Sequence, residues 1–281
     1  MTMDLPIDGE QTSLNLSTGA NPKEVKQAKL SSPSKKNQGG QGIIKIPRRC
    51  RKEIEGFFDT LKHQSKKITK YRKEWGQQIA PSSDHSRLNR WRFAFCTVHT
   101  PWLTSCEQFQ DIQCLYENVT PERLAEKLSL SGGGMHKIKA EGINNLHELW
   151  NTRQELFDFD GLTTREEWQN VRNKLTNKLT KLGSAKTSFA IEMLRPLNAQ
   201  VICIDRHMFK AFGWQNVDKG APIKQYEYYE SYWLELCKEY KIEPAVCRNL
   251  YWDIIQQQPS SMYWGSCLLY TSPSPRDCRL S

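Results

Sequence analysis

Lys186 and Asp205 stand 19 positions apart in the central part of the chain. Leu182 and Gly183 form a short turn before the lysine, and the apolar run 201–204 leads directly into the aspartate. Each of the two residues lies at or near an expected helix start, where backbone N–H groups can hold a phosphate. A lysine amine beside a carboxylate and such a turn indicates covalent chemistry on a nucleic acid. Taken singly, the same residues are also consistent with a surface lysine, a helix-capping aspartate and an ordinary helix–helix corner.

The apolar periodicity around these residues predicts an all-α protein of about ten helices. Thr120 and Pro121 have the residue types of an N-cap and a first helical position. Thr163 or Thr164, followed by Glu166 and Glu167, can form a capping box. Helices are expected from 87 to 99, through 109–115, from 121 onward, and over 135–150, 164–179, 186–194, 206–212, 226–240 and 243–256.

The N-terminal part of the chain is basic and polar. Residues 1–46 are rich in Ser, Asn, Gln, Gly and Lys and are predicted to be disordered. Residues 47–80 form an expected basic amphipathic helical arm, either one helix or a pair. The formal charge is +9, and residues 1–76 hold 16 Lys and Arg against 8 Asp and Glu. This arm suits a polyanion, although a solvated charged face is equally consistent.

Nine cysteines are scattered singly without Cys-x2-Cys spacing, which argues against a zinc knuckle and favours buried thiols in a reducing compartment. The chain contains no run of 18 apolar residues and no signal peptide, so we expect a soluble intracellular protein, cytoplasmic or nucleoid-associated in a prokaryotic or viral source. Residues 267–281 match the translation of a sequencing adaptor. We therefore expect this tail to be an artefact and the natural C-terminus to be missing.

Two stretches resemble the helix-hairpin-helix DNA glycosylase superfamily: Leu182-Gly183-x-x-Lys186 and Ile204-Asp205-Arg206-His207. The second is closest to the 8-oxoguanine glycosylase/lyase branch. Upstream, 95–102 resembles the family's early helix end, with His99 at the position of the residue that wedges into the duplex, and 134–140 resembles its Gly-x-x-x-x-Lys-Ala helix start. The resemblance covers about 85–257. It departs at the hairpin, where the family has two glycines and this chain has Lys181 in place of the first.

The resemblance implies two helical subdomains flanking a cleft, and base excision from a nucleotide flipped out of the duplex. Lys186 would attack C1′ as a neutral amine, and Asp205 would stabilise the oxocarbenium-like transition state. Loss of the base would leave a Schiff base, and β-elimination would then nick the strand. DNA contacts are expected from His99, Lys139, Gly183, Ser184, Ala185 and Arg206.

The same resemblance implies duplex DNA with a damaged base as the partner, a monomer, and no contact with membranes. It implies no required cofactor, a monovalent cation at the hairpin and, because the four-Cys loop is absent from the sequence, no iron–sulfur cluster. 8-Oxoguanine is the favoured base. The alternatives are the same fold acting on oxidised pyrimidines or mismatched thymine, and a non-catalytic helix-hairpin-helix DNA-binding protein.

Overall fold

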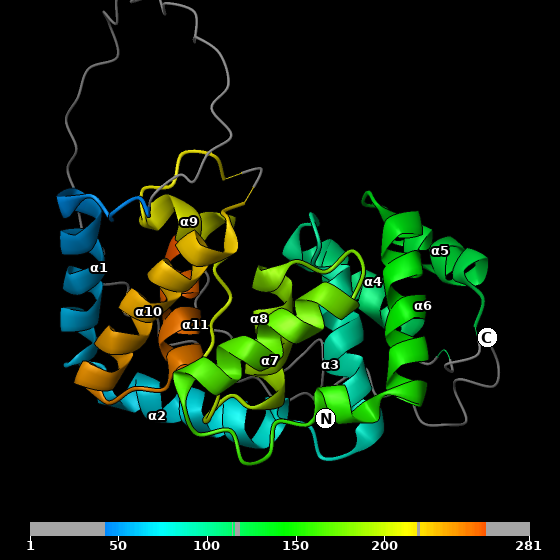
Figure 1. Ribbon diagram of the computed structural model, residues 1–281, viewed down its shortest axis with the longest axis horizontal. Coiled ribbons are helices and arrows are strands. Elements are labelled where there is room, and N and C mark those ends of the chain that lie inside the picture. Colours follow the sequence, from blue (N-terminus) through cyan, green and yellow to red (C-terminus); the bar gives the residue numbers. More distant parts are fainter. Residues whose placement is uncertain (1–42, 114, 116–118, 218–219, 257–281) are drawn as a thin grey trace, which may run out of the picture. The chain divides into compact units, whose positions relative to one another are not determined.

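The computed structural model describes residues 43–113, 115, 119–217 and 220–256 (Figure 1). These residues form eleven α-helices, one π-helical turn and one short 3-10 helix, and no strand occurs among them. The prediction of an all-α protein is therefore confirmed. Most of the segment predicted to be disordered, residues 1–42, and the whole adaptor-like tail at 267–281 lie outside the described residues.

The basic N-terminal arm is a pair of helices, α1 (Arg48–Leu61) and α2 (Ser65–Glu74), and α2 continues into the π-helical turn η1 (Trp75–Ile79). The apolar face of α1 is buried, and the Phe58 ring lies 4.9 Å from Trp233 on α10, measured between ring centroids. Hydrophobic burial therefore holds this arm against the rest of the fold. Its exposed cations are Arg48, Arg49, Lys52, Lys62, Lys66, Lys70 and Lys73.

Four helices form the group that surrounds the His99 turn: α3 (Asp84–Cys96), α4 (Trp102–Ile112), α5 (Pro121–Leu130) and α6 (His136–Thr152). Ser83 and Ser86 cap α3 reciprocally, and the predicted Thr120 cap with Pro121 begins α5. Residues Leu88–Cys96 of α3 are all buried, so this helix is central to its group. It packs against α4, α6 and α8.

Two helices form the expected hairpin, α7 (Arg165–Lys178) and α8 (Ser184–Leu194), after the short 3-10 helix η2 (Gln154–Phe157). The predicted capping box at the start of α7 is formed by Thr164 and Glu167. Two backbone N–H groups donate to Glu167, and they lower the pKa of its carboxyl to about 2. Local sequence signals thus determine where the first helix of the hairpin begins.

The remaining helices are α9 (Arg206–Ala211), α10 (Ile223–Tyr240) and α11 (Pro244–Gln256). Figure 1 shows α1, α9, α10 and α11 gathered on one side of the hairpin helices α7 and α8, with α3–α6 on the other. The buried extended segment 201–204 leads into α9. Lys186 lies in the first turn of α8, the second hairpin helix, and the extended segment leads to Asp205 at the start of α9.

Candidate active site

Lys186 lies in the first turn of α8, directly after the hairpin. Gly183 is the N-cap of this helix, and its carbonyl oxygen accepts the N–H groups of Lys186 and Thr187, each at 3.0 Å. Because a glycine cap has no side chain to accept from the backbone N–H groups of the first turn, these donors remain available to an anion. A Cβ at Gly183 would meet nothing within 4 Å, so this approach is open. The Lys186 side chain is half-buried, with Nζ 5.6 Å from the centroid of the Phe189 ring.

Asp205 is the N-cap of α9. One carboxylate oxygen, Oδ1, accepts the backbone N–H groups of His207 and Met208 at 2.9 and 3.0 Å. The side chain is half-buried, so it keeps access to solvent while these two bonds orient it. Asp205 is therefore a helix cap whose carboxylate lies at the exposed start of its helix.

Lys186 and Asp205 both influence the thiol of Cys203, which is buried in the segment before the aspartate. Burial raises the pKa of this thiol to about 12; the Lys186 charge opposes the rise and the Asp205 charge adds to it. Two charges that act on one buried thiol lie in the same region of the protein. The two residues predicted to be catalytic therefore lie in one region of the protein, Lys186 on the helix after the hairpin and Asp205 on the helix after the segment 201–204.

The segment 201–204 is held by side chains, because it has no neighbouring strand in the described part of the chain. Its N–H groups reach three buried acceptors: Ile202 N donates to Glu230, Cys203 N to Glu192, and Ile204 N to the Tyr226 hydroxyl, at 3.0, 3.0 and 3.1 Å. The Tyr226 hydroxyl in turn donates to the Ile202 carbonyl at 2.6 Å. Buried backbone groups need partners, and here side chains supply what a sheet would otherwise provide.

Both carboxylates in this network are paired with buried arginines. Arg172 on α7 lies 3.2 Å from Glu230, and Arg248 on α11 lies 2.5 Å from Glu192. Burial raises the pKa of Glu192, an effect that the Arg248 charge opposes. The segment before Asp205 is thus anchored to α7, α8, α10 and α11 at once.

His99 lies in the turn between α3 and α4. Its side chain is exposed, and its backbone is left-handed, with φ 48°. A non-glycine residue in this conformation needs support from its surroundings. The tip of this turn presents His99 to solvent, as a residue that enters a DNA duplex requires.

Lys139 supports that turn from beneath. Its side chain is only 1% exposed, and Nζ donates to Cys96 O at 2.8 Å, to Gln108 Oε1 at 2.7 Å and to Thr100 Oγ1. Two of these acceptors lie on either side of His99 in sequence. Burial lowers the pKa of Lys139 to about 8, and the Lys186 charge adds to the lowering. A side chain in this position does not reach a phosphate outside the protein, so we assign Lys139 a role in holding the turn rather than the DNA contact expected from sequence.

The other residues predicted to contact DNA lie at two helix starts. Ser184 and Ala185 are half-buried in the first turn of α8, and Arg206 is exposed as the first residue of α9.

In the hairpin turn, the left-handed backbone conformation that glycine favours is adopted by a lysine and not by the glycine. Lys181 is the left-handed residue, with φ 67°, whereas Gly183 has φ −81°. The position at which the family has its first glycine therefore keeps a glycine-like backbone although it carries a lysine side chain.

Sequence reasoning missed the buried acceptors and the arginines that pair with them. A signal was present at Glu192, which interrupts the apolar run from Phe189 to Leu194. A carboxylate in such a run is either at the surface or paired inside, and the run predicts burial. Its partner Arg248 is 56 positions away, so the sequence alone did not identify it.

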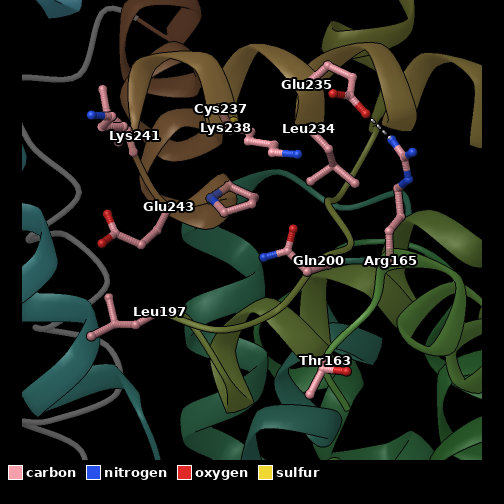
Figure 2. A pocket seen from close by; sticks show the side chains of 12 residues that line it. Thr163, Arg165, Leu197, Gln200, Leu234, Glu235, Cys237, Lys238, Lys241 and Glu243 are labelled. Atoms are coloured by element: carbon pink, nitrogen blue, oxygen red, sulfur yellow. Dashed lines mark hydrogen bonds and ion pairs between the residues drawn. The ribbon is translucent and has the colours of Figure 1, made fainter.

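A cavity of about 540 Å³ lies away from this site, at the C-terminal end of α10 (Figure 2). Figure 2 shows Arg165 and Glu235 pointing toward each other at its edge, and Nη1 of the arginine lies 2.8 Å from the carboxylate. Neither Lys186 nor Asp205 lines this cavity, so it does not supply a pocket for a base next to them. It is lined by Thr163, Arg165, Leu197, Gln200, Leu234, Glu235, Cys237, Lys238, Lys241, Ile242, Glu243 and Pro244.

The described residues contain neither a candidate metal site nor a helix that could cross a membrane. No group of three or more His, Cys, Asp or Glu side chains in this part of the chain is placed to hold a metal ion. Within the same ranges, none of the helices combines the length and apolar character that crossing a membrane requires.

Solved structures resemble this chain, although no protein-family model and no curated protein matches it. The 8-oxoguanine DNA glycosylase of Thermotoga maritima matches with a TM-score of 0.55 at 16% identity, over 73% of this chain and 95% of that one. The 8-oxoguanine DNA glycosylase of Methanocaldococcus jannaschii matches with a TM-score of 0.56 at 14% identity, over 75% and 96%. A structure of 8-oxoguanine glycosylase/lyase from the same organism, bound to a 15mer DNA containing 8-oxoguanine, matches with a TM-score of 0.54 at 18% identity. The match covers 75% of this chain and 95% of that one.

The chain has the fold of the 8-oxoguanine DNA glycosylases. This likeness spans nearly the whole length of each of these glycosylases. The resemblance inferred from the residues around Lys186 and Asp205 is thereby confirmed at the level of the fold.

Proposed function

We propose that this protein is a DNA glycosylase with lyase activity that removes an oxidised base, 8-oxoguanine first of all, from duplex DNA. The observation that carries the proposal is the placement of Lys186 and Asp205 at the starts of α8 and α9 within a glycosylase fold, where Glu192 of the Lys186 helix binds the Cys203 N–H two residues before Asp205. The structure of the glycosylase/lyase bound to 8-oxoguanine DNA supports DNA as the substrate class.

The chemistry begins with the Lys186 amine. Its nitrogen forms a bond to C1′ of the flipped nucleotide, while the glycosidic bond breaks and the base leaves with that electron pair and gains a proton. The Asp205 carboxylate stabilises the positive charge that develops on the sugar. The sugar ring opens to a Schiff base, and loss of a C2′ proton then expels the 3′ phosphate. Water releases the lysine.

The surrounding residues position the DNA. The first turn of α8, with Gly183, Ser184 and Ala185, offers backbone N–H groups to a phosphate at an open helix start. Arg206 offers an exposed cation at the start of α9. His99, at the tip of its left-handed turn, fills the space that the flipped base leaves.

Borohydride trapping tests the proposal, because it reduces a Schiff base to a stable adduct. Duplexes carrying 8-oxoguanine, an oxidised pyrimidine or mismatched thymine are incubated with wild type, Lys186→Gln and Lys181→Gln. Lys181 is an exposed lysine of the same hairpin, so it is the matched control. We expect an adduct on the 8-oxoguanine duplex with wild type and Lys181→Gln, and none with Lys186→Gln.

Two other outcomes would change the conclusion. An adduct on only the pyrimidine or thymine duplex would replace the substrate and keep the mechanism. DNA binding with no adduct and no base release on any duplex would instead identify a non-catalytic helix-hairpin-helix binding module.

A further inference from the structure

The position of Asp205 depends on the buried segment before it, and one acceptor of that segment belongs to the helix that carries Lys186. Glu192 lies six positions after Lys186 on α8 and accepts the Cys203 N–H at 3.0 Å. Cys203 is two residues before Asp205. A single side chain therefore connects the lysine's helix directly to the backbone that leads into the aspartate.

Arg248 fixes Glu192 in this position. Its Nε and Nη2 lie 3.2 and 2.5 Å from the two carboxylate oxygens, which is a bidentate arrangement. Arg248 also lies over the Phe189 ring, with Cζ 5.4 Å from the centroid, and Lys186 Nζ is 5.6 Å from the same centroid. The ring, the carboxylate and the guanidinium thus connect α8, α11 and the segment before Asp205.

Stability alone does not explain why a buried Glu192–Arg248 ion pair is present here. The side chains of Glu192 and Arg248 are 0% and 3% exposed. Burying two charges costs desolvation energy, and well-packed apolar residues of similar volume often serve a fold equally well. What the carboxylate supplies and an apolar side chain does not is a directed acceptor for the Cys203 N–H.

We propose that Glu192, oriented by Arg248, is a positioning residue that holds Asp205 in register with Lys186 for the catalytic step. The inference rests on the proposed function. The Glu192 acceptor acts on geometry and does not touch the substrate. Its loss should therefore slow the chemical step and leave DNA affinity unchanged.

Two double variants isolate this contact. Glu192→Gln with Arg248→Met keeps a side-chain oxygen at position 192, whereas Glu192→Met with Arg248→Met removes it at similar volume. Both variants lack the buried charge pair, so neither is left with an unpaired ion. The measurements are thermal unfolding, hydrogen exchange at the Cys203 amide, affinity for 8-oxoguanine DNA, and the single-turnover rate of base release.

We expect the Met/Met variant to exchange the Cys203 amide about tenfold faster than the Gln/Met variant, because its N–H has lost its acceptor. Base release should be roughly 10- to 100-fold slower in the Met/Met variant, since a misplacement of about 1 Å has such a cost. DNA affinity should agree within about twofold between the two variants. Base release by the Gln/Met variant should lie between the wild-type and Met/Met rates, because the acceptor is kept while Arg248 no longer orients it.

Equal rates of base release in the two variants would overturn the positioning role. Equal exchange at Cys203 would also overturn it, because the Glu192 acceptor would then not restrain the segment. If wild type releases no base from any duplex, the proposed function itself is refuted and the catalytic role falls with it. The Cys203 exchange would then show separately whether Glu192 holds the segment.

Discussion

Asp205 has one role in the structure and another in the proposed reaction, and a pair of substitutions can separate them. Its carboxylate caps α9 by accepting the N–H groups of His207 and Met208, and in the proposed reaction it also stabilises a cation. Asn caps helices about as well as Asp, whereas Ala loses the cap, at a typical cost of about 1 kcal/mol. For a domain of this size, about 1 kcal/mol lowers the melting temperature by roughly 2–4 °C. Both substitutions remove the negative charge, which should slow base release by about 10²- to 10³-fold.

The assay combines thermal unfolding with single-turnover base release from an 8-oxoguanine duplex. Asp205→Asn should melt within about 1 °C of wild type. Asp205→Ala should melt at a lower temperature, and both should lose base release to a similar extent. An asparagine variant that is as unstable as the alanine variant would refute the capping role. One that retains the wild-type rate would refute the electrostatic role, whatever its stability.

Other predictions concern the hairpin, the His99 turn and the packing of α6. Gly183→Ala should change the free energy of unfolding by less than about 1 kcal/mol, since a Cβ there meets nothing within 4 Å and alanine is only a poorer N-cap than glycine. It should weaken affinity for duplex DNA, because the added methyl group lies at the helix start proposed to bind a phosphate. Lys181→Gly should raise the free energy of unfolding by about 0.5–1 kcal/mol in denaturant titrations, because φ 67° is strained for lysine. Gly142→Ala should destabilise by about 1–3 kcal/mol in the same titrations, because its Cβ would lie 2.4 Å from the Phe95 ring. The pKa of Lys139 is about 8 in the folded protein, against 10.5 ordinarily, so between these values the folded state binds fewer protons. The free energy of unfolding of wild type, measured relative to Lys139→Met, should therefore rise with pH across that window, and a flat difference would contradict the low pKa.

Local signals predicted much of the fold. Thr120 with Pro121, and Thr164 with Glu167, begin helices where the sequence indicates, because a cap depends on residues within one turn. The helix pair at 48–74 also follows from local periodicity. The positions of Lys186 and Asp205 at helix starts were predictable for a similar reason, since a glycine turn and an apolar run mark these starts in the sequence.

Contacts between distant residues were beyond local signals. Lys139 has the residue type of a DNA contact, and only its three acceptors, 31 to 43 positions away, show that it is buried. The left-handed backbone at Lys181 is unexpected for a lysine, because its side chain disfavours that conformation. In both cases the tertiary structure overrides the preference of the single residue.

The segment before Asp205 shows why the sequence predicts the spacing of the two candidate catalytic residues but not their orientation. The run 201–204 is apolar, and apolarity predicts burial without saying what pairs with the backbone. In the fold its N–H groups are bound by Glu192, Tyr226 and Glu230, which are 11 to 28 positions away. An extended segment held by side chains can be shifted by a change in any one of them, whereas a strand in a sheet is restrained along its whole length. The orientation of Asp205 relative to Lys186 is therefore a tertiary property, and we expect residues without chemical roles of their own to alter the rate of the proposed reaction.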